Sequence, residues 1–289
     1  MIYFYAPYAH AKYWMLPLYL YGQIISLALA KRNIKFTLIE HRKYFPENML
    51  KDDLLIFFTP KQPPDWVNLN GCSIIFINTE SCWSWDVEND IKKYENVKMI
   101  WDYSLKNINH LKKLFNIPVF YVPPTYSYFL ENHFIKENVE KDIDFLQFGK
   151  KNERRNFIGD KLIEKGYNYV MFAGRPDKLY EMINRSKIII IIHYYEHDIC
   201  VDSYRLFYLL ANKAFVIHEK PSNDEKLLED IFNKVLFSKY ENILDKADKY
   251  IKWSQKKRDS VSFDIYKWYK KYHSIDSFIP FKDIRRLLN

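Results

Sequence analysis

The chain has 289 residues, 48% of them hydrophobic and 18% aromatic, which excludes a disordered protein and suffices for one large domain or two of ordinary size. Its net charge of +8 fits nucleic-acid binders and also enzymes that bind phosphorylated ligands. The lysines are scattered among acidic residues, which favours the second class. No apolar run reaches the roughly 18 residues of a membrane span, so we expect a soluble protein, with a peripheral membrane contact left open. The cysteines Cys72, Cys82 and Cys200 have no metal-ligand spacing, which indicates a reduced, cytoplasmic setting and no metal site.

Strands and helices alternate through the first half of the chain. Short apolar or β-branched runs predict strands at 1–6, 34–40, 54–58, 73–78, 97–101 and 117–122. Amphipathic spacing predicts one helix that begins at Gly22-Gln23 and another at 105–115. Such alternation is typical of a doubly wound parallel sheet.

The same alternation resumes after a polar, aromatic connector. Strands are predicted at 142–148, 169–172, 188–192, 214–218 and 235–237, and helices at 155–165, 177–186, 224–232, 240–255 and 263–272. We therefore predict an α/β protein of two Rossmann-like domains that face each other across a cleft. The N-terminal domain is expected at 1–140 and the C-terminal domain at 141–262, with a last helical segment, 263–289, that returns to the first domain.

Five consecutive isoleucines at 188–192 mark where we look for function. A run that is apolar on both faces is typical of a central parallel strand, and ligands bind beyond the carboxyl ends of such strands. His193 ends this strand, where a lone histidine is more often a core or hinge residue than a ligand. Asp202 and Arg205 share a face of the next helix, where the acid suits ribose hydroxyls and the arginine a phosphate. The alternative is a helix cap with a surface ion pair.

Glycines directly follow two strands of the second half. Gly149 and Gly174 would let the backbone approach a ligand closely. After Gly149, the basic residues Lys150, Arg154 and Arg155 stand at the start of a helix, where the helix dipole favours anions. This pattern suits a diphosphate, and the alternative is a solvated basic loop.

Three strands of the first half are followed by groups that can exchange protons. His10, Glu80 and Asp102 would lie on one rim of the sheet, where a base and its orienting partner are needed. The alternatives are an ordinary loop histidine, and carboxylates that form turns or bind acceptor hydroxyls.

Five segments in order carry a resemblance to a known family: FINTESCW at 76–83, MIWDYSLKNI at 99–108, YVPPTYS at 121–127, DIDFLQFGKKNERR at 142–155 and HYYEHDICVDSYRLFYLLANKAFVIHE at 193–219. They resemble glycosyltransferases of the GT-B type, in the branch of the CgeB-like proteins. The resemblance implies a nucleotide-sugar donor bound by the C-terminal domain, an acceptor held by the N-terminal domain, and no obligatory metal. It also implies that Gly149, Arg154 and Arg155 border the diphosphate, and that Asp202 and Arg205 border the nucleotide.

The chain departs from the family at one pair of positions. Many retaining members carry two glutamates eight positions apart, and these positions fall here at Cys200 and Tyr208. An inverting reaction, with His10, Glu80 or Asp102 as the base, is therefore at least as plausible.

The predicted function is transfer of a hexosyl or pentosyl group from a nucleotide-diphosphate sugar to a glycan or glycoconjugate hydroxyl. No metal, other cofactor or nucleic-acid partner is expected. The predicted donor-binding residues are Gly149, Lys150, Arg154, Arg155, Gly174, His193, Asp202 and Arg205. The first alternative is a catalytically inactive module that binds a nucleotide-sugar, and nucleic-acid binding ranks third.

Overall fold

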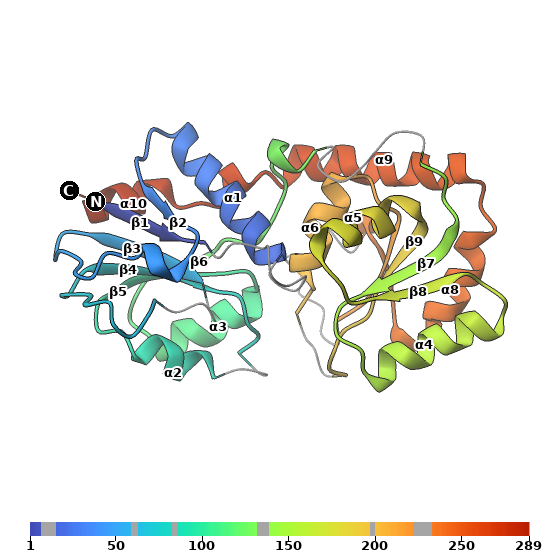
Figure 1. The fold of residues 1–289 in the computed structure, drawn as a ribbon, viewed down its shortest axis with the longest axis horizontal. Helices are drawn as coiled ribbons and strands as arrows, with labels where there is room; N and C mark the ends of the chain where they lie inside the picture. The colour runs from blue at the N-terminus through green and yellow to red at the C-terminus, as the bar shows by residue number, and fades with distance from the viewer. Residues whose placement is uncertain are drawn as a thin grey trace. The chain divides into compact units, whose positions relative to one another are not determined.

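The structure is a computed structural model, and it describes residues 1–6, 16–58, 63–82, 86–131, 139–196, 200–221 and 233–288. The chain divides into two compact units (Figure 1). Unit 1 contains Met1–Ala9, Pro17–Pro124 and Ile275–Asn289, and unit 2 consists mainly of Thr125–Ser274. Each unit has one parallel β-sheet with helices on both faces, which confirms the predicted pair of Rossmann-like domains.

The sheet of unit 1 has six strands in the order β2-β1-β3-β4-β5-β6. Its strands are β1 (Ile2–Tyr5), β2 (Thr37–Ile39), β3 (Leu54–Phe58), β4 (Ser73–Asn78), β5 (Val97–Asp102) and β6 (Val119–Tyr121). The predicted strands at 54–58 and 73–78 match β3 and β4 residue for residue. The order reverses between β1 and β3, so this is the topological switch point of unit 1.

Helices cover both faces of this sheet (Figure 1). Its helices are α1 (Leu16–Lys31), α2 (Val87–Lys92), α3 (Leu105–Leu114) and α10 (Phe281–Leu288), with short 3-10 turns at Arg42–Tyr44 and Ile275–Ser277. The prediction that the first helix begins at Gly22 is wrong, because α1 begins at Leu16. Gly22 lies inside the helix where α1 crosses Ala6, and a Cβ atom at Gly22 would lie only 2.5 Å from the Cβ of Ala6.

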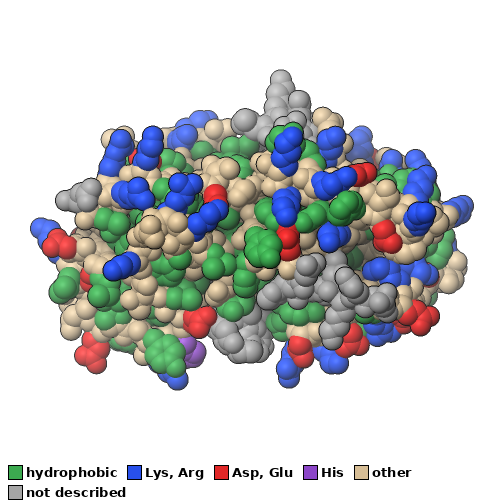
Figure 2. Space-filling view, turned by 90° about the horizontal axis from the view of Figure 1, so that it is seen from above, with side chains coloured by type: hydrophobic (Ala, Val, Ile, Leu, Met, Phe, Trp, Pro, Cys, Tyr) green, Lys and Arg blue, Asp and Glu red, His purple; other side chains and the backbone are tan. Residues whose placement is uncertain are grey.

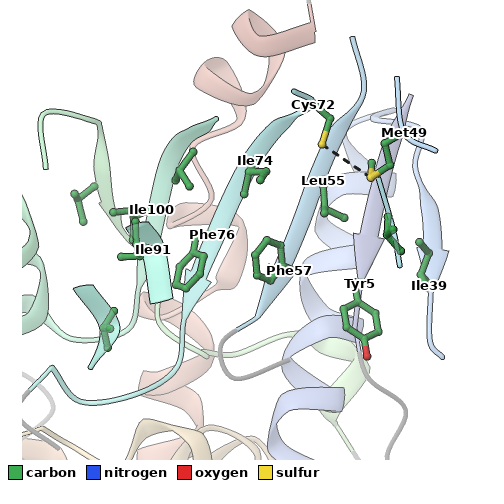
Figure 3. Close-up of a cluster of buried hydrophobic side chains, with 14 of the residues drawn as sticks. Tyr5, Ile39, Met49, Leu55, Phe57, Cys72, Ile74, Phe76, Ile91 and Ile100 are labelled. Atoms are coloured by element: carbon green, nitrogen blue, oxygen red, sulfur yellow. Dashed lines mark hydrogen bonds between the residues drawn. The ribbon is translucent and has the colours of Figure 1, made fainter. Parts of the chain in front are cut away.

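Alternate side chains of β3 and β4 form the core on one face of unit 1. Leu55 and Phe57 of β3 and Ile74 and Phe76 of β4 point to the same side (Figure 3), where they pack with residues of α2 and α3. The intervening side chains of β3, such as Ile56, are buried as well. Burial of both faces explains why these strands read as continuous apolar runs.

The sheet of unit 2 has five parallel strands in the order β11-β10-β9-β7-β8. They are β7 (Ile143–Phe148), β8 (Tyr169–Phe172), β9 (Ser186–Ile191), β10 (Val216–Glu219) and β11 (Leu236–Ser238). The isoleucine run is the central strand β9, as predicted. Ile188, Ile190 and Ile192 pack against α4 and α8, and the intervening isoleucines are buried as well. The order reverses between β7 and β9, which is the switch point of this unit.

Where a range was predicted, the described helices of unit 2 differ from it at one or both ends. They are α4 (Glu153–Glu164), α5 (Pro176–Arg185), α6 (Ser203–Ala211), α8 (Ile243–Ile251) and α9 (Gln255–Tyr272), with 3-10 turns at Tyr128–Leu130 and Tyr240–Asn242. The helix predicted at 240–255 spans only Ile243–Ile251. The helix predicted at 263–272 already begins at Gln255, because the Ser254 side chain caps α9 by accepting from the Lys257 N–H. The helix predicted at 224–232 lies outside the described residues. Among the helices that are described, none combines the length and apolar character needed to cross a bilayer.

The close approach of α1 to Ala6 leads to a prediction about thermal stability. Gly22→Ala should lower the melting temperature, because the overpacking cost of about 1–3 kcal/mol exceeds the gain in helix propensity of about 1 kcal/mol. Leu27→Ala, at an exposed position of the same helix, is the matched control and should change the melting temperature little. A Gly22→Ala protein at least as stable as the wild type would show that α1 does not pack this closely. Circular dichroism melts of both variants provide the measurement.

Candidate functional site

Gly149 lies at the switch point of unit 2, directly after β7. Its φ of +120° lies in the region that favours glycine, and its N–H donates to the Phe172 carbonyl at 3.0 Å. A Cβ atom here would lie 3.1 Å from Nη1 of Arg155 and 3.7 Å from Nη1 of Arg205. Two guanidinium groups therefore flank the open side of Gly149, so the structure brings these three predicted residues together.

Asp202 and Arg205 form an ion pair at the start of α6. The Asp202 carboxylate accepts from the Arg205 backbone N–H at 3.1 Å and from its Nε at 2.7 Å, and Nη2 contacts the same carboxylate. Nη1 of Arg205 donates to the Phe148 carbonyl at 3.1 Å, which ties α6 to the end of β7. Burial alone would raise the pKa of Asp202, but the charge and hydrogen bonds of Arg205 outweigh it and hold that pKa well below its usual range.

This pair leaves hydrogen-bonding capacity for a ligand. A guanidinium group has five N–H bonds. Within the described part of the chain, the contacts of Arg205 to Asp202 and Phe148 use three of them, one each on Nε, Nη1 and Nη2. The side chains of Arg205 and Asp202 keep 14% and 21% exposure, so a ligand can reach them.

Arg155 has a structural contact that the sequence did not predict. Its side chain is buried, with Nε and Nη2 donating to the Ile192 carbonyl at 3.0 and 2.7 Å and Nη1 to the Lys150 carbonyl at 2.7 Å. It thereby joins the loop after β7 to the end of β9. Asn152 adds a second link, since it caps α4 and donates to the Tyr194 carbonyl at 2.5 Å.

Arg154 makes a bidentate ion pair with Glu219, at 2.5 Å from Nη2 and 3.2 Å from Nη1. Glu219 is buried at the end of β10 and also accepts from the His193 backbone N–H at 2.8 Å. Sequence reasoning missed Glu219, although an acid that closes an apolar run is a usable signal. Arg154 therefore has a buried partner carboxylate of its own, unlike the exposed Lys150 beside it.

His193 is buried against His218, with ring centroids 5.4 Å apart. Burial, with a smaller contribution from His218, lowers the pKa of His193 to about 4, so the ring is neutral at physiological pH. A buried, neutral ring is typical of a core or hinge residue, the alternative role of His193, and not of a residue that binds phosphate.

Gly174 and Lys150 differ in their surroundings. A Cβ atom at Gly174 would lie 2.6 Å from the Phe172 ring, so close packing against that ring accounts for this glycine. Lys150 is exposed, and its Nζ lies 5.3 Å from the centre of the Tyr194 ring. Of the two, Lys150 is therefore available as a point charge for an anion.

In unit 1, Asp102 is fully buried at the end of β5 in a network of amides. Its oxygens accept from the Asn78 side chain at 2.6 Å, the Ser104 backbone N–H at 2.7 Å and the Asn107 side chain at 3.1 Å. The same two asparagines donate to the carbonyl of Glu80, at 2.8 and 2.9 Å. Asp102 therefore fixes the loop that carries Glu80 and has no exposed surface of its own.

The Glu80 side chain is half-buried, and within the described residues its carboxylate has no ion-pair partner. Burial, with a smaller contribution from Asp90, raises the pKa of Glu80 to about 7. A carboxyl group that titrates there can act as a base or an acid at physiological pH. His10, the third predicted group, lies outside the described residues.

The described residues contain no cluster of three or more His, Cys, Asp or Glu side chains that could hold a metal ion. In the same part of the chain Cys72, Cys82 and Cys200 are free thiols. Burial raises the pKa of Cys72 to about 11, which makes it unreactive.

Comparison with known proteins adds evidence on the fold. No protein-family profile matches the chain, and no curated protein sequence does. The crystal structure of the DNA-modifying enzyme β-glucosyltransferase, studied with and without uridine diphosphoglucose, has a TM-score of 0.60 and 10% identity over 100% of this chain and 99% of that one. A mutant of the T4 phage enzyme BGT in complex with UDP-glucose has a TM-score of 0.59 and 11% identity over the whole of both chains. The chain has a GT-B fold.

A third solved structure agrees with this fold. TarM has a TM-score of 0.55 and 12% identity over 86% of this chain, which spans only 56% of the TarM chain. At such identities the similarity shows the fold alone. The CgeB-like branch therefore stays a prediction from the sequence.

The raised pKa of Glu80 predicts how stability depends on pH. The ordinary pKa of a glutamate is 4.5, so between that pH and about 7 the folded protein keeps a proton that the unfolded chain has lost. Stability falls as the pH rises through this window, and Glu80→Gln removes the loss. The variant should melt higher than the wild type at pH 8 and not at pH 4. Glu95→Gln, at an exposed position of unit 1, is the control, and equal curves for wild type and Glu80→Gln would contradict the assignment.

Proposed function

We propose that the chain transfers a sugar from a nucleotide-diphosphate sugar to a hydroxyl acceptor. The observation that carries this proposal is the pair of guanidinium groups beside Gly149 at the switch point of unit 2. Open α/β sheets bind ligands at that point, and the starts of α4 and α6 favour negative charge there. The absence of a side chain at Gly149 leaves room for a phosphate against the backbone.

In this proposal the donor lies against α6. The uncommitted N–H bonds of Arg205 bind the diphosphate, and the exposed part of the Asp202 carboxylate accepts a ribose hydroxyl. When the bond between the sugar and the phosphate breaks, the diphosphate leaves with the electron pair. Arg205 and the exposed Lys150 then stabilise the charge that develops. Solved structures of this fold with UDP-glucose and with UDP support the choice of a nucleotide donor.

Glu80 is the proposed base of unit 1, because its pKa is close to physiological pH. It takes the proton of the acceptor hydroxyl, whose oxygen attacks the anomeric carbon, and the configuration inverts. Asp102 acts through the asparagine network that positions the Glu80 loop. His10 remains a second candidate base. We propose that the reaction requires no metal ion.

The acceptor has two candidates. A glycan or glycoconjugate is favoured because lysine and arginine side chains are spread over the face drawn in Figure 2, with acidic ones among them, rather than gathered in a single patch. A nucleic acid is the second candidate, on account of the net charge of +8 and the full-length similarity to a DNA-modifying glucosyltransferase. Radiolabelled transfer to polysaccharide or to duplex DNA distinguishes them.

A catalytically inactive nucleotide-sugar module is the alternative function. It is motivated by Cys200 and Tyr208, which occupy the positions of the two family glutamates. Sustained release of UDP from a UDP-sugar, or transfer to any acceptor, would exclude it.

Two glycines with positive φ allow a matched test of the donor site. Gly149→Ala places a methyl group between the two guanidinium groups and should weaken nucleotide-diphosphate binding by about tenfold or more. Gly166→Ala, at a φ of +83° with nothing within 4 Å of the added Cβ, also forces a side chain into the positive-φ region and should leave binding unchanged. Titration calorimetry with UDP, GDP, ADP and CDP gives the measurement. Equal losses in both variants, or no nucleotide bound by the wild type, would refute the donor site.

Substitution of the proposed base should separate chemistry from binding. Glu80→Gln should lower kcat by about 10²- to 10⁴-fold, the usual contribution of a general base, and leave the affinity for UDP unchanged. Glu95→Gln should retain kcat, and EDTA should not inhibit the wild type. Full kcat in Glu80→Gln would show that Glu80 is not the base and leave His10 as the candidate. Loss of activity in EDTA would contradict metal independence.

A further inference from the structure

A cavity lies at the opposite end of the unit 2 sheet from Gly149, and we call it the lower cavity. It has a volume of about 410 Å³ and is lined by residues at the amino ends of two strands, including Ser186 of β9 and Phe215 just before β10. The six residues of β9 span about 17 Å between the two ends. None of the donor-site residues lines this cavity, whose size is that of a small-molecule pocket.

The wall of this lower cavity combines apolar surface with ammonium groups. Apolar side chains come from α5, β9, the start of β10 and α9, among them Ile189 and Phe263, and the lysines are Lys141, Lys187 and Lys213. Lys187 pairs with Asp144 at 2.6 Å, so its charge is balanced. The other two lysines decide what the cavity can bind.

Lys141 and Lys213 have no carboxylate within ion-pair distance among the described residues. The Lys141 ammonium donates to the carbonyls of Asn184 and Ser186, both at 2.9 Å, and carbonyls satisfy its N–H bonds without neutralising its charge. Burial lowers the pKa of Lys141, an effect that Asp259 only partly offsets. A bound anion would therefore stabilise this group.

Lys213 lies near two aromatic rings. It follows the end of α6 with a φ of +57°, and its Nζ lies 5.9 Å from the centre of the Phe263 ring and 5.1 Å from that of Tyr266. Aromatic faces attract a cation but leave its charge uncompensated. Among the described residues that line the cavity Asp259 is the one acid, and Lys187 is already paired, so two lysines less one aspartate give an excess of one positive charge.

We propose that the lower cavity binds a small amphipathic monoanion, a carboxylate with an apolar aromatic or aliphatic body. The carboxylate lies at Lys141 and Lys213, and the body packs on Phe215, Phe263 and the neighbouring aliphatic side chains. This site is independent of the proposed transferase reaction, because its ligand meets different residues at the other end of the strands.

Three molecules of nearly equal shape test the proposal on the full chain. Titration or ligand-observed NMR compares 4-phenylbutyrate with its neutral amide, 4-phenylbutanamide, and with the cationic 4-phenylbutylamine. The acid should bind with a Kd of about 1 mM, as expected for a ligand of this size, and at least fivefold more tightly than the amide. Saturating UDP should not displace it. Equal binding of acid and amide, or displacement by UDP, would overturn the proposal.

Two variants locate the binding. Lys213→Gln removes an exposed charge and should weaken 4-phenylbutyrate at least fivefold, whereas Ala214→Phe fills the cavity, keeps every charge and should abolish binding. Lys252→Gln, at an exposed position outside the cavity, is the control and should bind normally. Circular dichroism confirms that each variant is folded. Normal binding by both folded cavity variants would show that the acid binds elsewhere and that the proposal is wrong.

Discussion

The arrangement at the switch point of unit 2 depends on one buried guanidinium group. Where β7 and β9 end, the chain leaves the sheet toward different helices, and the carbonyls exposed there need donors. Arg155 supplies them by bridging the Ile192 carbonyl and the Lys150 carbonyl. The bridge fixes the loop in which Gly149 has its positive φ and so sets the space between the two guanidinium groups. Arg155, which the sequence predicts to bind the donor, thus shapes the proposed donor site through contacts to the backbone.

In unit 1 the residue that orders a loop at a strand end is a buried carboxylate instead of a guanidinium group. Asp102 is buried at a strand end, and Asn78 and Asn107 connect its carboxylate to the carbonyl of Glu80. Each unit therefore uses one buried charged residue to shape a loop and leaves a less buried charged residue, Arg205 or Glu80, near the surface. In the proposed function the buried residue positions the loop and the less buried one acts on the substrate, a division that is typical of preorganised sites.

Sequence reasoning succeeded where burial on both faces makes a pattern unmistakable. The strands β3 and β4 were predicted residue for residue, and the grouping of Gly149, Arg155 and Arg205 followed from strand ends that share one edge. Sequence reasoning failed where an element's start or a residue's partner depends on the direction in which a side chain points. The first helix was predicted to begin at Gly22, a residue that lies inside it, and α2, with six residues, is too short to show a clear period. Arg154 and Arg155 are adjacent, yet one pairs with Glu219 and the other with carbonyls, because neighbours on a helix face different directions.

The missing family glutamate at position 208 can be understood from the geometry of α6. Positions 202 and 205 are three apart, as are 205 and 208, so Arg205 is a helix-surface neighbour of both. Tyr208 is fully buried, and burial keeps the pKa of its hydroxyl well above the usual range even though the nearby charge of Arg205 lowers it. A glutamate there would place a second buried carboxylate beside Arg205, which Asp202 already neutralises at the helix start. The acid that balances this arginine therefore stands at 202 instead of 208, nearer the strand ends, where its side chain stays 21% exposed.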